Sequence, residues 1–322
     1  MSKSVKIWLA AAAVLTLVGG IIFLSVMFFL KWDFGKLSTN KYETNNYEIS
    51  EDFRSIAIDT DTADIKFVAS EDSERRVTCY EQKNMKHEVL VNDGVLTVRV
   101  NDTRKWYEYI GINFRSPKIT VFLPKGEYGT LTVDSETGNV EIPKDLVFES
   151  MDITESTGKV VNRASVSGKV KIKTSTGNIR IEDISAGSLE LSVSTGKVSV
   201  LGVTCADNIK IKVSTGDTVL ENVECKSLVS KGSTGDISLT KVVASNDFSI
   251  ERSTGNIKFK ASDAAEIYVK TDTGNVKGDL LSSKIFVTKS DTGSVNVPET
   301  TTGGKCKITT DTGNIKITFT ES

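Results

Sequence analysis

The sequence predicts an all-β protein in which a single N-terminal transmembrane helix precedes a parallel β-solenoid. The solenoid has about ten rungs of 19–20 residues, with an inserted β cap near its N-terminal end. Three observations support this prediction: an uncharged apolar run opens the chain, Thr-Gly pairs recur at a nearly constant interval, and apolar residues alternate with polar ones around each pair. Alternation with a period of two is typical of strands with one buried face, whereas a helix needs a period of 3.6.

The composition is that of a folded chain and excludes several functions. Of the 322 residues, 39% are hydrophobic and 25% are charged, and the formal net charge is -2. A nearly balanced charge gives no electrostatic reason to expect a nucleic-acid partner. The single histidine, His87, excludes His-rich metal sites and makes any Ser-His-Asp triad depend on that one residue.

The first element is an apolar run over residues 7–30, which holds no charge and lies between Lys6 and Lys31. About 20 apolar residues in a helix cross the roughly 30 Å hydrocarbon core of a bilayer. A signal peptide is the alternative, but its apolar region is typically about 7–15 residues and ends in a small-residue cleavage site. The run here ends in "VMFFLKWDF", so we expect an uncleaved anchor.

The charges beside the anchor predict its orientation. Lys3 and Lys6 favour a cytoplasmic amino terminus over residues 1–6. The polar residues 31–46 then form a tether, and the rest of the chain lies outside the cytoplasm. The predicted location is therefore the cell membrane, with one span and an extracytoplasmic solenoid.

The repeat is identified by a glycine that follows threonine. This glycine recurs at Gly138, Gly158, Gly177, Gly196, Gly216, Gly235, Gly255, Gly274, Gly293 and Gly313. Apolar residues stand seven positions before it and, with few exceptions, five before, two after and four after. Each repeat therefore reads as strand, tight corner, strand and return. Glycine suits a corner that needs a positive φ or a close approach of two backbones.

One repeat alone does not bury its apolar face. Ordering the chain costs about 1–2 kcal/mol per residue, while an inward side chain returns about 1.5–3 kcal/mol. Stacking of rungs about 4.8 Å apart solves this, and it predicts a parallel β-solenoid over residues 134–322.

The same pattern begins earlier in a degenerate form. "SIAIDTDTADIKF" has apolar residues at the same offsets, with Ala63 in the place of the glycine, and we interpret it as the first rung. Residues 70–128 then break the period and contain strand-like runs at 95–100 and 118–123. The sequence Asn92-Asp93-Gly94 between two such runs predicts a hairpin. Residues 47–133 are therefore expected to form the first rung and an inserted β cap.

Three corners contain Asp-Thr-Gly, the triplet of aspartic proteases, at Asp272, Asp291 and Asp311. A protease needs two aspartates that converge from different halves of a fold. Because these are three consecutive members of one repeat, we predict no aspartic protease. A column of outward carboxylates is expected instead, which is a weak candidate for a cation such as Ca²⁺ unless Lys270 and Lys289 neutralise it. No cofactor is expected.

The large aromatic side chains concentrate in the insertion, in "RKWYEYIGINF" at residues 104–114. Trp106, Tyr107 and Tyr109 are the candidate binding residues, because large amphipathic rings dominate binding hot spots. The alternative is that they pack as part of the cap. Within the repeats, Tyr268 is the only Tyr or Trp, and the rungs lack the long loops that build a cleft.

The cysteines and the distal end raise two further expectations. Cys205 and Cys225 both lie nine residues after a corner glycine, so they stack on adjacent rungs within reach of a disulfide. Their column otherwise holds small residues, which favours buried free thiols. The last segment, "TGNIKITFTES", leaves a bare edge at the C-terminal end of the solenoid. Such an edge favours self-association or docking of another strand.

The anchor, the degenerate first rung, the "ITVFLPKG" strand and the train of S/D-T-G-x-I/V corners resemble a bacterial family of candidate adhesins of unknown function, the Lia-type membrane-anchored proteins with β-strand repeats. The resemblance covers about residues 47–320. It implies a cell-envelope protein, linked in some members to envelope-stress systems, and it brings no catalytic residues.

The predicted function is a non-enzymatic, membrane-anchored binding or scaffold module. Its expected partners are the membrane, an envelope protein or a cell-wall glycan. One alternative is an accessory to a membrane-embedded envelope-stress system. The other alternative is an enzyme that acts on polysaccharide, which would need a cleft with converging acids and bases.

Overall fold

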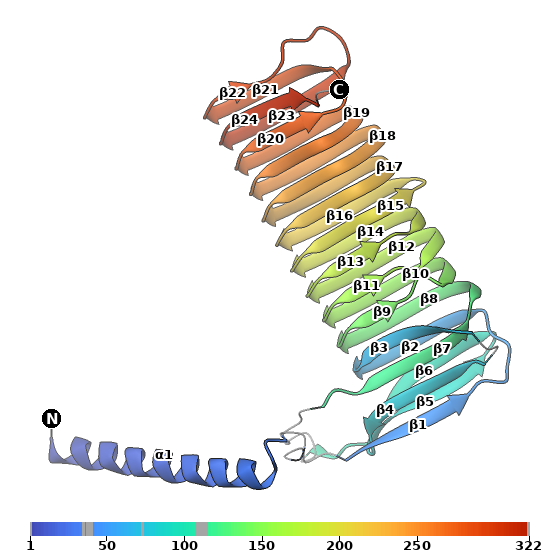
Figure 1. The fold of residues 1–322 in the computed structure, drawn as a ribbon, viewed down its shortest axis with the longest axis vertical. Coiled ribbons are helices and arrows are strands. Elements are labelled where there is room, and N and C mark those ends of the chain that lie inside the picture. Colours follow the sequence, from blue (N-terminus) through green and yellow to red (C-terminus); the bar gives the residue numbers. More distant parts are fainter. Residues whose placement is uncertain (1, 34–35, 37–40, 72–73, 107–114, 321–322) are drawn as a thin grey trace.

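The computed structural model describes residues 2–33, 36, 41–71, 74–106 and 115–320. The chain begins with helix α1 (Lys3–Phe29), continues through a small cap, and ends in a long stack of strands (Figure 1). Ser2 caps α1, with its Oγ accepting a hydrogen bond from the Val5 N–H. The helix is long and apolar enough to cross a membrane, and its apolar side chains are almost all exposed.

The stack is a parallel β-solenoid with two main faces, as predicted. The strands that precede a corner are β2 (Ser55–Thr62), β8 (Gly126–Thr137), β10 (Leu146–Thr157), β12 (Ser165–Thr176), β14 (Ser185–Thr195), β16 (Asn208–Thr215), β21 (Lys284–Thr292) and β23 (Gly304–Thr312). Those that follow a corner are β3 (Asp64–Ser70), β9 (Val140–Ile142), β11 (Val160–Asn162), β13 (Ile179–Glu182), β15 (Val198–Cys205), β20 (Val276–Leu280), β22 (Val295–Asn296) and β24 (Ile315–Phe319). Three long strands, β17 (Thr218–Thr234), β18 (Ile237–Thr254) and β19 (Ile257–Thr273), run from one face to the other.

The corners behave as the repeat predicts. Gly196 has a φ of 145°, and a Cβ there would lie 1.7 Å from the carbonyl oxygen of Gly177 on the preceding rung. Both a positive φ and a close backbone approach therefore require glycine. The corner threonines are register partners from rung to rung, for example Thr137 with Thr157 and Thr157 with Thr176.

The core consists of the side chains that point inward from each strand. The residues seven before the corner glycine and two after it are buried along almost the whole rod, as predicted from their alternation. The exceptions belong to one rung: Phe286 is only partly buried, and Val295 is 43% exposed. That rung lies at the distal end of the stack.

The order of the last rungs differs from the expectation. Strand β23 pairs with β19 on one side and with β21 on the other, and β24 lies in the same way between β20 and β22 (Figure 1). The chain's last strand is therefore internal, and the bare edge predicted for "TGNIKITFTES" belongs to residues 284–296 instead. Burial of apolar side chains explains why the rung of β23 and β24 lies inside the rung of β21 and β22. Ile315 and Ile317 are almost fully buried on the inner of these two rungs, whereas Val295 is exposed on the outer one.

The proximal end is covered by the inserted cap. The cap strands are β1 (Tyr42–Glu48), β4 (Arg76–Gln82), β5 (Met85–Asn92), β6 (Val95–Asp102) and β7 (Lys118–Pro124). Strands β6 and β7 continue the stack in parallel beside β2 and β3, while β1, β4 and β5 pair antiparallel. The predicted hairpin is confirmed: Asn92 pairs with Val95, and both Asp93 and Gly94 have a positive φ, as in a type I′ turn.

Candidate functional site

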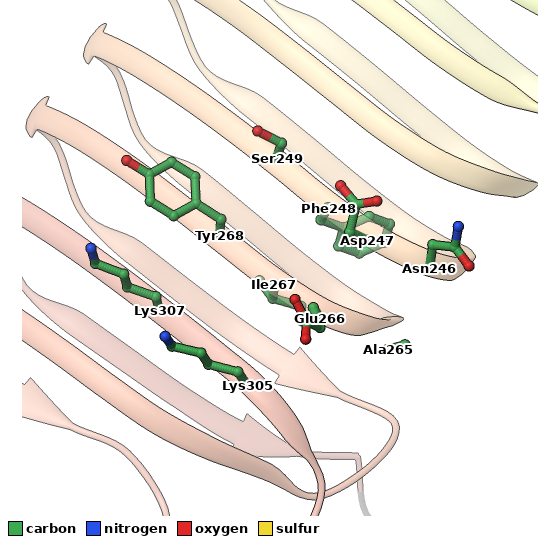
Figure 2. Close-up of a pocket in the computed structure, with 10 residues that line it drawn as sticks. All are labelled: Asn246, Asp247, Phe248, Ser249, Ala265, Glu266, Ile267, Tyr268, Lys305 and Lys307. Atoms are coloured by element: carbon green, nitrogen blue, oxygen red, sulfur yellow. The ribbon is translucent and has the colours of Figure 1, made fainter.

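A hollow on the outer surface of the solenoid brings an aromatic ring and several charged side chains together. It has a volume of about 570 Å³ and lies over β18, β19 and β23 (Figure 2). We call it the Tyr268 hollow. Its lining residues are Asn246, Asp247, Phe248, Ser249, Ala265, Glu266, Ile267, Tyr268, Lys305 and Lys307.

Strand alternation positions the Tyr268 ring. Ile267 and Val269 point into the core, so Tyr268 between them points outward. Its register partners are Ser249 on β18 and Lys307 on β23. The small serine leaves one side of the ring open, while the Lys307 Nζ lies 5.8 Å from the ring centroid on the other side.

The charges of the hollow come from neighbouring rungs. Asp247 and Glu266 are register partners, and Figure 2 shows Glu266 on the same strand as Tyr268 and Asp247 on the strand beside it. The Ser227 hydroxyl donates to the Asp247 Oδ1 over 2.6 Å, which orients that carboxylate. Lys305 and Lys307 supply two exposed ammonium groups from β23. The hollow therefore offers an aromatic face, hydrogen-bond acceptors and cations to one ligand.

Of the three aromatic residues predicted from the insertion, the structure describes Trp106, which does not line this hollow. Trp106 follows the cap strand β6 and is 76% exposed. Tyr107 and Tyr109 lie outside the described residues. The sequence contains the signal for the Tyr268 hollow, since Tyr268 is the only Tyr or Trp of the repeats, but the facing charges come from rungs about 20 and 40 residues away.

The corner aspartates form a column whose order is Asp272, Asp311 and Asp291, because the last two rungs are exchanged. The Lys270 Nζ lies 3.7 Å from the Asp272 Oδ1, and the Lys289 Nζ lies 2.7 Å from the Asp291 Oδ1. Asp272 and Asp291 therefore each lie beside the lysine that the sequence offers as a neutralising partner.

The sequence did not reveal a buried polar cluster in the cap. We call it the His87 cluster, and it consists of Thr60 on β2, Cys79 and Glu81 on β4, and His87 on β5. The His87 Nδ1 lies 2.7 Å from the Glu81 Oε2, and the His87 Nε2 lies 2.9 Å from the Thr60 Oγ1. Hydroxyl, imidazole and carboxylate thus follow one another as in a Ser-His-Asp triad. All of these residues are at most 3% exposed, so no substrate reaches the Thr60 hydroxyl.

The cysteines are buried thiols. Cys79, Cys205, Cys225 and Cys306 are all free, in agreement with the buried-thiol interpretation of their column. Burial raises the pKa of the Cys225 and Cys306 thiols to about 12 and also raises that of Cys205. The thiols of Cys205, Cys225 and Cys306 in the solenoid therefore remain protonated and unreactive at neutral pH.

Comparisons with known proteins agree with this architecture. The model of the Toastrack DUF4097 family matches residues 53–210 and 202–322. The chain belongs to the Toastrack DUF4097 family. The predicted resemblance to candidate adhesins is confirmed, since a solved structure with that description shares the fold of this Toastrack chain.

This structure, of a candidate adhesin from Parabacteroides merdae, is 17% identical with a TM-score of 0.52, over 74% of the Toastrack chain and 97% of the other. A candidate adhesin from Bacteroides fragilis is 16% identical, with a TM-score of 0.42 over 86% and 97%. A candidate lipid-binding protein from Parabacteroides distasonis is 17% identical, with a TM-score of 0.45 over 87% and 98%. No curated protein matches the sequence.

Proposed function

We propose that this Toastrack protein is a non-enzymatic binding or scaffold module of the cell envelope, anchored by α1 and carrying its solenoid outside the cytoplasm. The observation that supports binding is the Tyr268 hollow, which brings an aromatic ring, two carboxylates and two ammonium groups together on the outer face. Aromatic rings with nearby polar groups that fix orientation are the usual elements of a ligand site.

The chemistry of the hollow favours a glycan as the ligand. A sugar ring stacks its C–H face on an aromatic side chain, and its hydroxyls donate to carboxylates such as those of Asp247 and Glu266. The ammonium groups of Lys305 and Lys307 suit an anionic substituent on the same polymer. A cell-wall glycan has both features, and a rigid rod holds the hollow away from the membrane.

The geometry favours binding over catalysis. Glycoside hydrolysis needs two carboxyl groups on opposite sides of the scissile bond, one of them held protonated by its surroundings. Asp247 and Glu266 instead stand side by side on adjacent strands of one open face. The hollow is shallow and exposed, which suits reversible contact with a polymer.

Co-sedimentation of the full chain, purified in detergent, with isolated cell-wall material tests the proposal. We expect saturable binding that Tyr268→Ala weakens about tenfold or more, as for a binding hot spot. Thr132→Ala is the matched control, because Thr132 holds the same outward position on β8. The double variant Trp106→Ala and Tyr107→Ala tests the cap residues separately. Absence of binding by the unmodified chain would contradict the glycan-binding function.

The orientation has its own test. In intact cells freed of their wall, added protease should degrade the solenoid, since Lys3 and Lys6 favour a cytoplasmic amino terminus. Full protection of the solenoid in those cells, with degradation after the membrane is opened, would show the reverse topology.

A further inference from the structure

The His87 cluster has the composition and the geometry of a metal site. One ligand atom each from Cys79, Glu81 and His87 lies within 4.8 Å of the other two, and all three residues are buried. We propose that Cys79, Glu81 and His87 bind a zinc ion that stabilises the cap from within. This site is separate from the Tyr268 hollow and does not depend on the function proposed for it.

Strand pairing brings the three ligands together. Cys79 and Glu81 are two residues apart on β4, so both side chains point to the inner face of the cap. Strand β5 turns back antiparallel to β4 directly after Gln82, and this places His87 beside Glu81. The His87 backbone N–H donates to the Glu81 Oε2, and the Tyr47 hydroxyl donates to the His87 carbonyl, which fixes both strands around the site.

The outer contacts of the ligands are those that metal ligands have. In metal sites, a ligating histidine donates its other ring N–H to an acceptor, and a ligating carboxylate is itself hydrogen-bonded. Here the His87 Nε2 has the Thr60 Oγ1 at 2.9 Å, and the Glu81 Oε1 accepts from the Asn45 Nδ2 at 2.7 Å. These contacts leave the His87 Nδ1 and the Glu81 Oε2 facing each other, on the side where Cys79 lies.

Charge and ligand type identify the ion as zinc. Thiolate and imidazole are ligands that zinc accepts and that calcium and magnesium do not favour. Zn²⁺ with one thiolate and one carboxylate has no net charge, which suits a buried position because an unbalanced charge there is costly. Binding releases the proton of the Cys79 thiol, because zinc takes the thiolate, and it requires that the His87 Nδ1 carries no proton.

Cobalt provides a direct probe of the ligand set. The full chain is produced in medium supplemented with Co²⁺, because a buried site takes up metal as the cap folds, and is purified in detergent. We expect about one Co²⁺ per chain and a near-ultraviolet thiolate-to-cobalt band. A cobalt-loaded chain without that band, or a chain with no bound metal after growth in Co²⁺ or Zn²⁺, would overturn the proposal without any variant.

Three variants then test the Cys79 ligand, a control thiol and the Thr60 contact. Cys79→Ser should abolish the band and the bound metal, while Cys306→Ser, which alters an equally buried thiol in the solenoid, should leave both unchanged. Thr60→Val should weaken zinc affinity about 10–100-fold and keep the stoichiometry at saturation, as for a contact that acts through a ligand. Equal zinc content and an equal band in Cys79→Ser and the unmodified chain would contradict the assignment.

Discussion

The two ends of the solenoid are closed to different degrees. At the proximal end, β6 and β7 extend both faces beyond the first rung, and Phe67 on that rung is 1% exposed. At the distal end, β21 and β22 form the last described rung, and Phe286 and Val295 remain partly open. Because the stability of a stacked repeat comes mainly from interfaces with its neighbours, a rung with one neighbour is held less firmly than a rung with two.

The open end also presents apolar side chains to solvent. Leu281, Ile285 and Val287 are 49%, 44% and 47% exposed, and a hollow of about 620 Å³ lies beside Phe286. An unpaired edge with apolar neighbours is a template for further strand pairing. The self-association expected at the distal end stays a prediction, and β21 and β22 are now the edge that it would use.

Substitution at a corner should have the largest effect and should separate the two regions. Gly196→Ala places a Cβ 1.7 Å from a backbone oxygen, with rungs on both sides, and we expect a loss of about 4 kcal/mol or more. Gly293→Ala meets the Gly313 oxygen at 2.2 Å, but the terminal rung can move away at a smaller cost. Thermal unfolding of both variants measures this, and equal losses would show that the terminal rung is as constrained as an internal one.

Truncation of a core aromatic side chain should also reduce stability more at the proximal end than at the distal end, and by less than the corner substitution. Phe67→Ala removes a fully buried ring that packs edge-on against Phe148, at a cost of about 3–5 kcal/mol. Phe286→Ala removes a partly buried ring that contacts Phe319, and we expect about 1–2 kcal/mol. Denaturant unfolding gives both values. A larger loss for Phe286→Ala would mean that the distal rung is covered in solution.

Several polar side chains lie in a column inside the corner, at the position three residues before the corner glycine. The residues in this column also change along the rod. In the distal half, Thr271 donates to the Gly255 carbonyl and Thr310 to the Gly274 carbonyl, at 3.2 and 3.1 Å. Arg252 fills the same position by extending into the space left by Gly232, where it donates to the Val213 carbonyl. Glu155 holds this position near the proximal end. A carboxylate accepts hydrogen bonds only, so the neutral acid fits this column better.

Stability should therefore depend on pH through Glu155. Burial is the main reason why the pKa of the Glu155 carboxyl is raised from 4.5 to about 7, and the nearby charges of Asp134 and Asp64 contribute in the same direction. Neither carboxyl oxygen has a hydrogen-bond partner among the described residues. A raised carboxyl pKa means that the folded state holds the proton more tightly. The contribution of Glu155 to the free energy of unfolding is thus highest below pH 4.5, falls by about 3 kcal/mol between pH 4.5 and 7, and levels off above pH 7.

Glu155→Gln tests this, because glutamine is neutral at every pH. We expect the variant to lack the decline and to exceed the unmodified chain by up to about 3 kcal/mol at pH 8, as measured by denaturant unfolding across this range. Glu127→Gln, an exposed residue on β8, should behave like the unmodified chain. An unchanged pH profile in Glu155→Gln would show that the carboxyl is ionised inside the corner.

The regular rungs and the two ends of the molecule also differ in how much of their structure could be predicted from the sequence. The spacing of the repeats and the residue types at each turn are local features of the sequence. The rungs, the hairpin at Asn92-Asp93-Gly94 and the buried columns could therefore all be predicted. The order of the last two rungs could not, because both have the same spacing and their exchange depends on which one buries more apolar surface. The His87 cluster was missed for a related reason: Cys79, Glu81 and His87 come from two strands of an insertion that has no repeat to align, and they meet Thr60 of the first rung only in the folded chain.

The smallest effect is expected at the corner aspartates. Asp291 on the terminal rung and Asp272 on an internal rung each pair with a half-exposed or exposed lysine, and such pairs contribute about 0–1 kcal/mol. Asp291→Asn and Asp272→Asn should therefore both change stability by less than about 1 kcal/mol, with a slightly larger change for Asp272 because it has rungs on both sides. Thermal unfolding at low and high salt measures this, since screening should remove most of either change. A rise in melting temperature on addition of Ca²⁺ that both variants abolish would instead identify the column as a cation site.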